Sequence, residues 1–368
     1  VAARALQGLG AAAMMTLSVA FIGETVSKDK TGSSMGLLGT MSAIGTALGP
    51  SLGGVLIGAI GWQSIFLLNV PLGILTFILT FYFLPSDQQK EKNKEIVIDK
   101  LGTSLLFLTL ASYSLALTIG RGTFGFLNLA LLLTAVFGFC FFILAQIKTA
   151  APLIKLNLFR EPQFSFGFAL SILVAMVLMT TLVVGPFYLS ITLGLNSVTV
   201  GMIMSIGPLA VVLTGIPIGH LVDKLGEKRL TILGLINILV GSFLLAIIPA
   251  SLGIIGYVVP IIVITVGYAI FQTANNTFVM KDVQPDQRGV ISGLLNLSRN
   301  LGLITGTTLM GAVFAFTVGT NELSKAQTEA VARGMQISFA LATILIFAAF
   351  VLVVKMGWIK WKSGSQQK

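Results

Sequence analysis

Long apolar runs separated by short polar stretches divide the chain into segments of similar length. Each run, at about 1.5 Å of rise per helical residue, can cross a hydrocarbon core roughly 30 Å thick. None of the runs alternates polar and apolar positions as membrane-barrel strands do, so helices are predicted. We expect eleven spans, at about 1–23, 32–60, 64–84, 101–120, 124–147, 164–192, 198–222, 229–249, 252–277, 289–318 and 335–357.

Composition also indicates an all-α integral membrane protein. Of the 368 residues, 55% are hydrophobic and 10% are charged, against roughly 25% charged in ordinary soluble domains. One cysteine, Cys140, and one histidine, His220, cannot supply the usual zinc constellations. No phosphate-binding loop with a Walker lysine is present in the sequence. We therefore expect no metal, no cofactor and no direct use of ATP.

Basic residues gather on one side of the predicted threading. Eighteen lie in alternate connections and in the C-terminal tail, whereas the other connections hold only Arg121, Lys325 and Arg333. This asymmetry predicts a multi-pass protein of the cell membrane with a cytoplasmic C-terminus. It also accounts for the net charge of +10 without a nucleic-acid partner.

An internal repeat appears when the chain is shifted by 257 residues, because GSSMGLLGTMSAIGTALGPSLGG (32–54) then aligns with GVISGLLNLSRNLGLITGTTLMG (289–311). Three spans precede the second copy and none precedes the first, so we expect three spans to be missing before Val1 and the chain to be an N-terminally truncated fragment. The expected parts are a partial N-terminal bundle at 1–84, a cytoplasmic linker at 85–100, an inserted two-helix segment at 101–147, a linker at 148–162, a six-helix bundle at 163–357 and a cytoplasmic tail at 358–368.

Several motifs accompany this repeat. GTALGPSLGG (45–54) follows the pattern G-x-x-x-G-P-x-x-G-G, RALQGLGAA (4–12) follows R-x-x-Q-G-x-G-A-A, and GHLVDKLGEKR (219–229) follows a cytoplasmic-loop pattern, apart from Glu227 where a base is usual. In these residues the chain resembles the major facilitator superfamily, and specifically its fourteen-span drug:proton antiporter branch. The resemblance extends over essentially the whole chain. It implies two pseudo-symmetric six-helix bundles with an inserted helix pair.

The resemblance assigns an antiporter motif to the first repeat. Small residues four positions apart let another helix approach closely, and a proline bends the helix. In the family this contact seals the extracellular side of the cavity; close packing without gating is the alternative. The motif residues are Gly45, Gly49, Pro50, Gly53 and Gly54.

We expect different surroundings for the two arginines that lie within predicted spans. The resemblance gives Arg4, with Gln7 and Gly8, a part in proton coupling, and a cation in hydrocarbon is costly unless it faces a polar cavity. Extension of Arg4 toward the outer surface is the alternative. Arg299 is expected to extend toward the cytoplasm. Because all thirteen acidic residues lie in connections or at span ends, we expect the coupling carboxylate to lie in the missing first span.

The cytoplasmic-loop motif comprises Gly219, Asp223, Gly226, Lys228 and Arg229. In the family such a loop holds the ends of the two bundles together. Asp223 could equally cap the helix that follows the loop or pair with Lys228 or Arg229. Both roles remain open at this point.

The family cavity would be lined by adaptable or aromatic residues of three spans. For any single residue, packing in the core or against lipid is the alternative. The candidates are Met14, Met15, Met176, Met179, Phe187, Tyr188, Tyr268, Phe271, Gln272 and Asn275.

The sequence therefore predicts a monomeric secondary transporter that exports small amphipathic compounds, cationic or neutral, in exchange for protons by alternating access across the lipid bilayer. Export of one specific metabolite or lipid-like compound is an alternative, and a non-transporting membrane scaffold is a weaker one. An enzyme is not expected, because no cluster of polar catalytic residues shares one depth. GSSMG (32–36) matches G-x-S-x-G, but it lies at the start of a predicted helix and not at a strand-to-helix turn.

Overall fold

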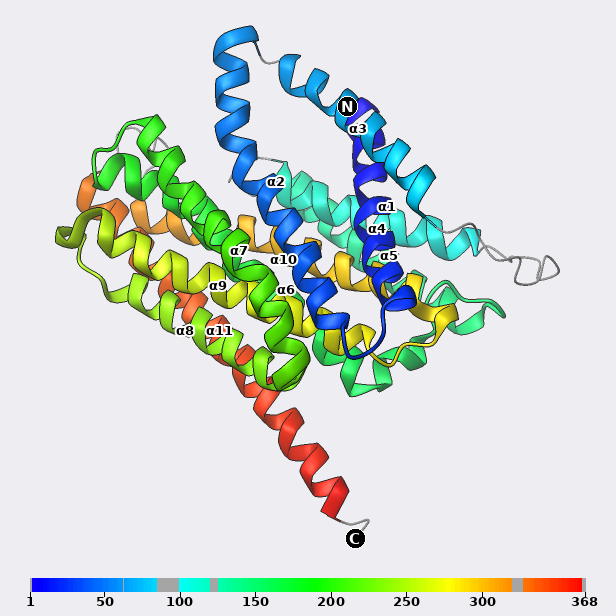
Figure 1. Ribbon diagram of the computed structural model, residues 1–368. Coiled ribbons are helices and arrows are strands. Elements are labelled where there is room, and N and C mark those ends of the chain that lie inside the picture. Colours follow the sequence, from blue (N-terminus) through cyan, green and yellow to red (C-terminus); the bar gives the residue numbers. More distant parts are fainter. Residues whose placement is uncertain (1, 62, 85–98, 120–124, 320–326, 366–368) are drawn as a thin grey trace.

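Long helices form at the apolar runs in the computed structural model, which describes residues 2–61, 63–84, 99–119, 125–319 and 327–365 (Figure 1). The helices are α1 (Ala2–Thr25), α2 (Thr31–Ile60), α3 (Gln63–Phe83), α4 (Lys100–Thr118), α5 (Phe126–Lys148), α6 (Pro162–Phe187), α7 (Ser197–Leu225), α8 (Glu227–Ile247), α9 (Gly253–Met280), α10 (Arg288–Val318) and α11 (Thr328–Ser365). Short helical turns are η1 (Leu156–Arg160), η2 (Tyr188–Thr192), η3 (Ala250–Leu252) and η4 (Pro285–Gln287).

The predicted all-α membrane architecture is confirmed. Within the described ranges, ten helices are long and apolar enough to cross a membrane, and α2 forms a continuous helix of 30 residues over the remaining predicted run. The largest differences in bounds are at α11, which begins seven residues before the predicted start at 335 and ends eight residues after the predicted end at 357. Its first turns, TEAVAR, contain good helix formers, so the helix begins before the apolar run does.

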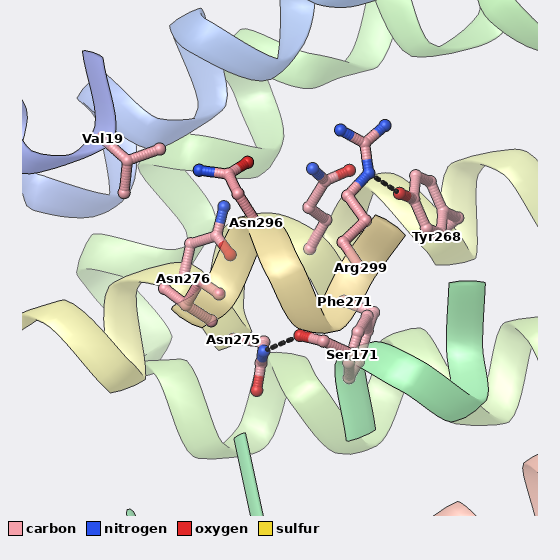
Figure 2. Close-up of a pocket in the computed structure, with 10 residues that line it drawn as sticks. Val19, Ser171, Tyr268, Phe271, Asn275, Asn276, Asn296 and Arg299 are labelled. Atoms are coloured by element: carbon pink, nitrogen blue, oxygen red, sulfur yellow. Dashed lines mark hydrogen bonds between the residues drawn. The ribbon is translucent and has the colours of Figure 1, made fainter. Parts of the chain in front are cut away.

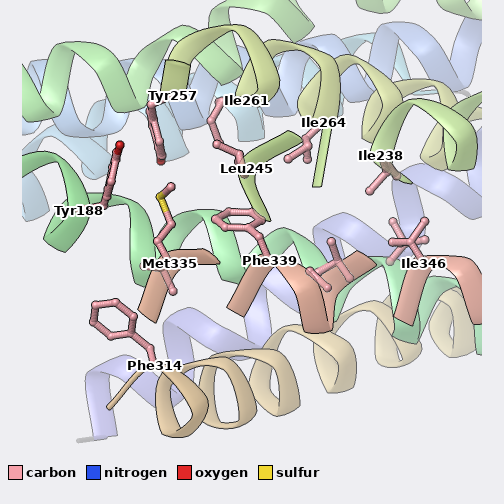
Figure 3. Close-up of a cluster of buried hydrophobic side chains, with 14 of the residues drawn as sticks. Tyr188, Ile238, Leu245, Tyr257, Ile261, Ile264, Phe314, Met335, Phe339 and Ile346 are labelled. Atoms are coloured by element: carbon pink, nitrogen blue, oxygen red, sulfur yellow. The ribbon is translucent and has the colours of Figure 1, made fainter. Parts of the chain in front are cut away.

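The C-terminal helices α6 to α11 pack around a continuous apolar core (Figure 3). Phe339 and Ile346 of α11 are fully buried in it, and Tyr188 stacks on Tyr257 with ring centroids 5.9 Å apart. Small residues bring the helix backbones together: a Cβ added to Gly234 of α8 would lie 2.8 Å from the carbonyl oxygen of Gly267 in α9. Close packing of this kind is how membrane helices associate without a hydrophobic driving force.

The first three helices attach to this bundle mainly through α2. Helix α2 runs along α7, α1 contacts α10 and α2, and α3 packs against α2 (Figure 1). The N-terminal helices α1 and α2 therefore face the C-terminal bundle directly.

Helices α4 and α5 are joined at one end by a buried hydrogen-bond network. The Asp99 carboxylate accepts from the Gly102 backbone nitrogen at 2.7 Å and from Gln146 Nε2 at 2.6 Å. The amide of Gly102, followed by the side chain of Gln146, holds the pKa of Asp99 below its usual value of 3.8. On the other side of the pair, the hydroxyls of Tyr113 and Thr305 are 2.5 Å apart and connect α4 to α10.

Candidate functional site

A cavity of about 450 Å³ lies between α1 and α2 on one side and α6, α7, α9 and α10 on the other. Its volume falls in the range of roughly 300–1,000 Å³ that is usual for small-molecule sites. Each of these helices contributes side chains to its wall. The cavity therefore lies where the N-terminal helices α1 and α2 meet the C-terminal helices, and transporters built from repeated bundles bind their substrates at such an interface.

One wall of the cavity is polar and is built by α9 and α10. Tyr268, Gln272 and Asn276 are spaced four residues apart along one face of α9. Asn296 and Arg299 are spaced three apart on α10, so they also share a face. Figure 2 shows Asn296 and Arg299 extending to the same side of α10, with Asn276 beside Asn296.

Arg299 is the charged residue of this wall. Its Nε donates a hydrogen bond to the Tyr268 hydroxyl at 3.1 Å (Figure 2), and its side chain lines the cavity. The expectation that Arg299 extends toward the cytoplasmic surface is therefore wrong: the cavity and the hydroxyl acceptor supply the polar surroundings that the cation requires. Among the described residues, no carboxylate lines the cavity and no ion pair involves Arg299.

The opposite walls are rich in methionine. These thioether side chains are flexible and polarizable, so they adapt to ligands of different shapes. The cavity-lining methionines are Met14, Met15, Met35, Met41, Met179 and Met204. Gly39 of α2 also lines the cavity, and no described atom of a neighbouring element lies within 4 Å of a Cβ added there.

A smaller pocket of about 30 Å³ adjoins the polar wall. Asn275 lines it and is buried, with 1% of its surface exposed. Its Nδ2 donates to the Gly167 carbonyl at 3.1 Å and to Ser171 Oγ at 3.0 Å. These bonds join α9 to α6, so Asn275 holds the packing behind the polar wall.

The cytoplasmic-loop motif, which begins in the last turns of α7, contacts the start of α2. Asp223, in the last turn of α7, accepts hydrogen bonds from the backbone nitrogens of Gly32 at 2.7 Å and Ser33 at 2.8 Å. Ser33 Oγ also donates to the Asp223 carboxylate and lies 2.9 Å from His220 Nδ1. Asp223 therefore caps α2 and not the helix that follows its own loop. Helix α8 instead follows directly after Gly226, whose φ of 87° permits the tight turn from α7.

Ion pairs near the same helix ends connect further loops. Lys28 Nζ lies 2.7 Å from Asp282 Oδ1, which joins the α1–α2 and α9–α10 connections. Glu227, the residue that departs from the loop motif, pairs with Lys281 at 3.1 Å. The basic motif residues Lys228 and Arg229 are exposed and form no ion pair within the described part of the chain.

Glycines of α2 make their close helix contact nearer the start of the helix than the antiporter motif predicted. A Cβ added to Gly36 would lie 2.7 Å from the carbonyl oxygen of Gly215 and 2.8 Å from the Cα of Gly219. At Gly45 and Gly49 a Cβ would meet no described atom within 4 Å. The tight backbone contact between α2 and α7 is thus made by the glycines next to Asp223.

The corresponding glycines of the second repeat are tightly packed. Gly302 lies against the backbone of Ile172, and a Cβ added to Gly306 would be 2.6 Å from the Met176 Cα. Both contacts are made with α6. In the first repeat, α2 continues as a helix through Pro50, Gly53 and Gly54, but the surroundings of these three residues lie outside the described side chains. The sealing role of the motif stays a prediction.

The Arg4 motif lies outside the large cavity. Arg4 Nη1 donates to Gln7 Oε1 at 2.8 Å, and the guanidinium lies over the Phe66 ring, 4.8 Å from its centroid. No described atom is within 4 Å of a Cβ added to Gly8. The two polar side chains of the motif contact each other, while their part in proton coupling stays a prediction.

The ten predicted cavity residues divide into three groups. Those that line the large cavity are Met14, Met15, Met179, Tyr268 and Gln272. Phe271 and Asn275 line the smaller pocket. The remaining three lie in helix contacts: Met176 faces Gly306, Phe187 stacks on Phe314, and Tyr188 stacks on Tyr257.

Sequence reasoning missed the amides Asn276 and Asn296 and the cation Arg299 of the cavity wall, together with its serine and threonine residues. The available signal was the stretch NLSRN (296–300), which places amides and a cation inside an otherwise apolar run. Polar residues at membrane depth usually face a cavity or the bundle interior. Applied to Arg299, that rule identifies the wall.

Known proteins resemble the chain along most of its length. The riboflavin transporter RibZ of Clostridioides difficile (strain 630) is 27% identical over 354 residues, covering 96% of this chain and 76% of the relative. The uncharacterized transporter YebQ of Escherichia coli (strain K12) is 30% identical, with 84% and 67% covered. The multidrug resistance protein Stp of Mycobacterium tuberculosis is 26% identical, with 85% and 58% covered.

Among solved structures, a bacterial homologue of the iron transporter ferroportin in an outward-facing state is similar at 17% identity. The TM-score is 0.42, with 94% of this chain and 87% of the other covered. A likeness of this degree carries no conclusion about this chain. The family model of the Major Facilitator Superfamily, by contrast, matches residues 1–307. The chain therefore belongs to the Major Facilitator Superfamily and has its all-α membrane fold.

Proposed function

We propose that this protein is a secondary active transporter that exports small amphipathic organic compounds in exchange for protons. The observation that carries the proposal is the cavity of about 450 Å³ between the two repeats, with its methionine-rich wall. Such a wall suits apolar bodies of variable shape. The relatives named as multidrug proteins support efflux of this kind.

The antiporter motifs support the drug:proton branch of the family. Movement would consist of rocking of α1 and α2 against the C-terminal bundle, about the glycine contact between α2 and α7. No carboxylate is among the described cavity-lining residues, so in this proposal the proton-coupling role falls to the motif near Arg4. Arg4 and Gln7 are the candidates that the motif supplies.

A second candidate function is transport of one specific metabolite. The polar wall favours it, because convergent amides and a cation can select a particular polar group. A riboflavin transporter is among the relatives. The cavity also alters the expected charge preference: with Arg299 present and no carboxylate among the described lining residues, neutral or anionic compounds fit better than cations.

The test is transport by the purified full-length protein in proteoliposomes. The protein is inserted with its cytoplasmic face toward the outside of the vesicle, and the vesicle interior is made acid. Amphipathic fluorescent compounds should then accumulate inside, and a protonophore should abolish the accumulation. Accumulation that is unchanged by the protonophore would contradict proton exchange. Absence of movement for every compound, by a protein that unfolds cooperatively on heating, would contradict transport.

A further inference from the structure

The polar wall of the cavity contains a cation without a carboxylate partner among the described residues. Arg299 lies within α10, a helix of 31 residues, and its side chain lines the cavity. A guanidinium remains charged at any physiological pH. The Nε hydrogen bond to the neutral Tyr268 hydroxyl orients the group but does not neutralise it. A charge held in this way is available to a ligand.

The orientation leaves the terminal nitrogens of Arg299 available. Only Nε is engaged by Tyr268 (Figure 2) within the described part of the chain. The two terminal nitrogens of a guanidinium match the two oxygens of a carboxylate. Tyr268 therefore fixes the plane of the donor group and leaves the binding atoms exposed to the cavity.

Amide side chains extend the donor set beside the guanidinium. Asn296 lies one helical turn before Arg299, and Asn276 and Gln272 approach from α9. Their NH₂ groups can donate to an anion and their carbonyl oxygens can accept from neighbouring hydroxyls. The arrangement suits a carboxylate that carries additional hydrogen-bonding atoms.

We infer that Arg299, with Asn296 and Asn276, forms a subsite for the carboxylate of an amphipathic organic anion, whose apolar body lies against the methionine wall. This inference rests on the proposed transport function and names its substrate class. An organic anion fits better than an inorganic one, because Met14, Met15 and the other methionines line the remainder of the same cavity. The polar wall fixes the end of the ligand and the methionines accommodate its body.

The test compares two probes of the same size and apolar body that differ only at the terminal group, N-dansylglycine with its carboxylate and its neutral amide. Binding to the purified chain is followed by dansyl fluorescence. Wild-type protein should bind the carboxylate about 10-fold more tightly than the amide, as expected for a charge-assisted contact. Arg299→Gln should lose that preference while binding of the amide stays within about twofold of wild type.

Matched variants separate charge recognition from packing. Arg299→Lys keeps the charge but not the paired geometry, so it should retain part of the preference. Arg333→Gln, on the exposed surface of α11, should bind both probes as wild type does. Equal weakening of both probes by Arg299→Gln would overturn the subsite, since it would indicate a packing role with Tyr268.

Two further outcomes distinguish this inference from the transport proposal. Wild-type protein that binds and transports the amide but does not prefer the carboxylate overturns the anion subsite and leaves transport standing. Wild-type protein that retains the carboxylate preference but moves neither probe in vesicles supports the subsite and contradicts the transport proposal.

Discussion

The Asp223 carboxylate lies 2.7 Å from the backbone nitrogen of Gly32, so the end of α7 in the C-terminal bundle caps the start of α2 in the N-terminal part of the chain. A carboxylate is stabilised at a helix N-terminus by the free amides and by the helix dipole. The contact lies beside the close approach of Gly36 to Gly215 and Gly219. Charge and close packing therefore hold the same pair of helices together.

Replacing Asp223 with asparagine should weaken this contact. The amide keeps one acceptor but loses the charge, and we expect the free energy of unfolding to fall by about 0.5–2 kcal/mol. Thermal unfolding in detergent, followed by tryptophan fluorescence, measures the change. Asp286→Asn is the matched control, because its 3.9 Å pair with Lys155 is exposed and should contribute less than about 1 kcal/mol. Equal losses in the two variants would contradict the capping role.

Alanine substitutions in α2 should have opposite effects at two glycines. At Gly36 the added Cβ meets backbone atoms of Gly215 and Gly219, which cannot move away as a side chain can, and the cost should be about 1–3 kcal/mol. At Gly49 no described atom lies nearby, so Gly49→Ala should be neutral or should stabilise the helix by up to about 1 kcal/mol. Thermal unfolding again reports both values. A loss at Gly49 as large as that at Gly36 would indicate that the antiporter stripe is closely packed.

The pH dependence of stability should reveal the Asp99 network. Its pKa is lowered in the folded protein, so the stabilisation is complete above the usual value of 3.8 and is lost as the pH falls through the lower folded value. The difference in unfolding temperature between wild type and Asp99→Asn should thus be constant from about pH 8 to pH 5 and shrink below about pH 4. A difference that stays constant to about pH 3 would show that ionisation of Asp99 contributes nothing.

The fold could be predicted from the sequence because membrane helices must satisfy their own backbone hydrogen bonds. Apolar runs of spanning length therefore correspond to helices almost residue for residue, as at α2 and α10. The helix ends were less predictable where polar residues and alanines with good helix propensity precede the apolar run, as in the segment that begins at Thr328. There, hydropathy and helix propensity disagree.

The site was predictable only in part. The resemblance and residue type proposed Met14, Met15, Tyr268 and Gln272 as cavity residues, and all four line the large cavity. Residue type could not distinguish them from Phe187 and Tyr188, which stack on other aromatic rings. Arg299 was misplaced because its distance from the nearest span end favoured the membrane surface. The hydroxyl of Tyr268, 31 positions away in the sequence, determines its actual direction.

The claim that the cavity is the transport route is tested most directly by filling it. Gly39 lines the cavity and has no described neighbouring atom within 4 Å of an added Cβ, so a tryptophan there can occupy the cavity without displacing the described backbone. Gly73 of α3 is equally uncrowded and is not among the described lining residues, which makes Gly73→Trp the matched control. Both variants should remain folded.

The measurement is the initial rate of pH-driven accumulation of an amphipathic fluorescent compound in proteoliposomes. Gly39→Trp should lose most of the rate, falling by about 10-fold or more if the ligand and the indole compete for the same space. Gly73→Trp should keep the wild-type rate. A Gly39→Trp protein that is correctly folded and transports at the wild-type rate would contradict the assignment of this cavity as the route.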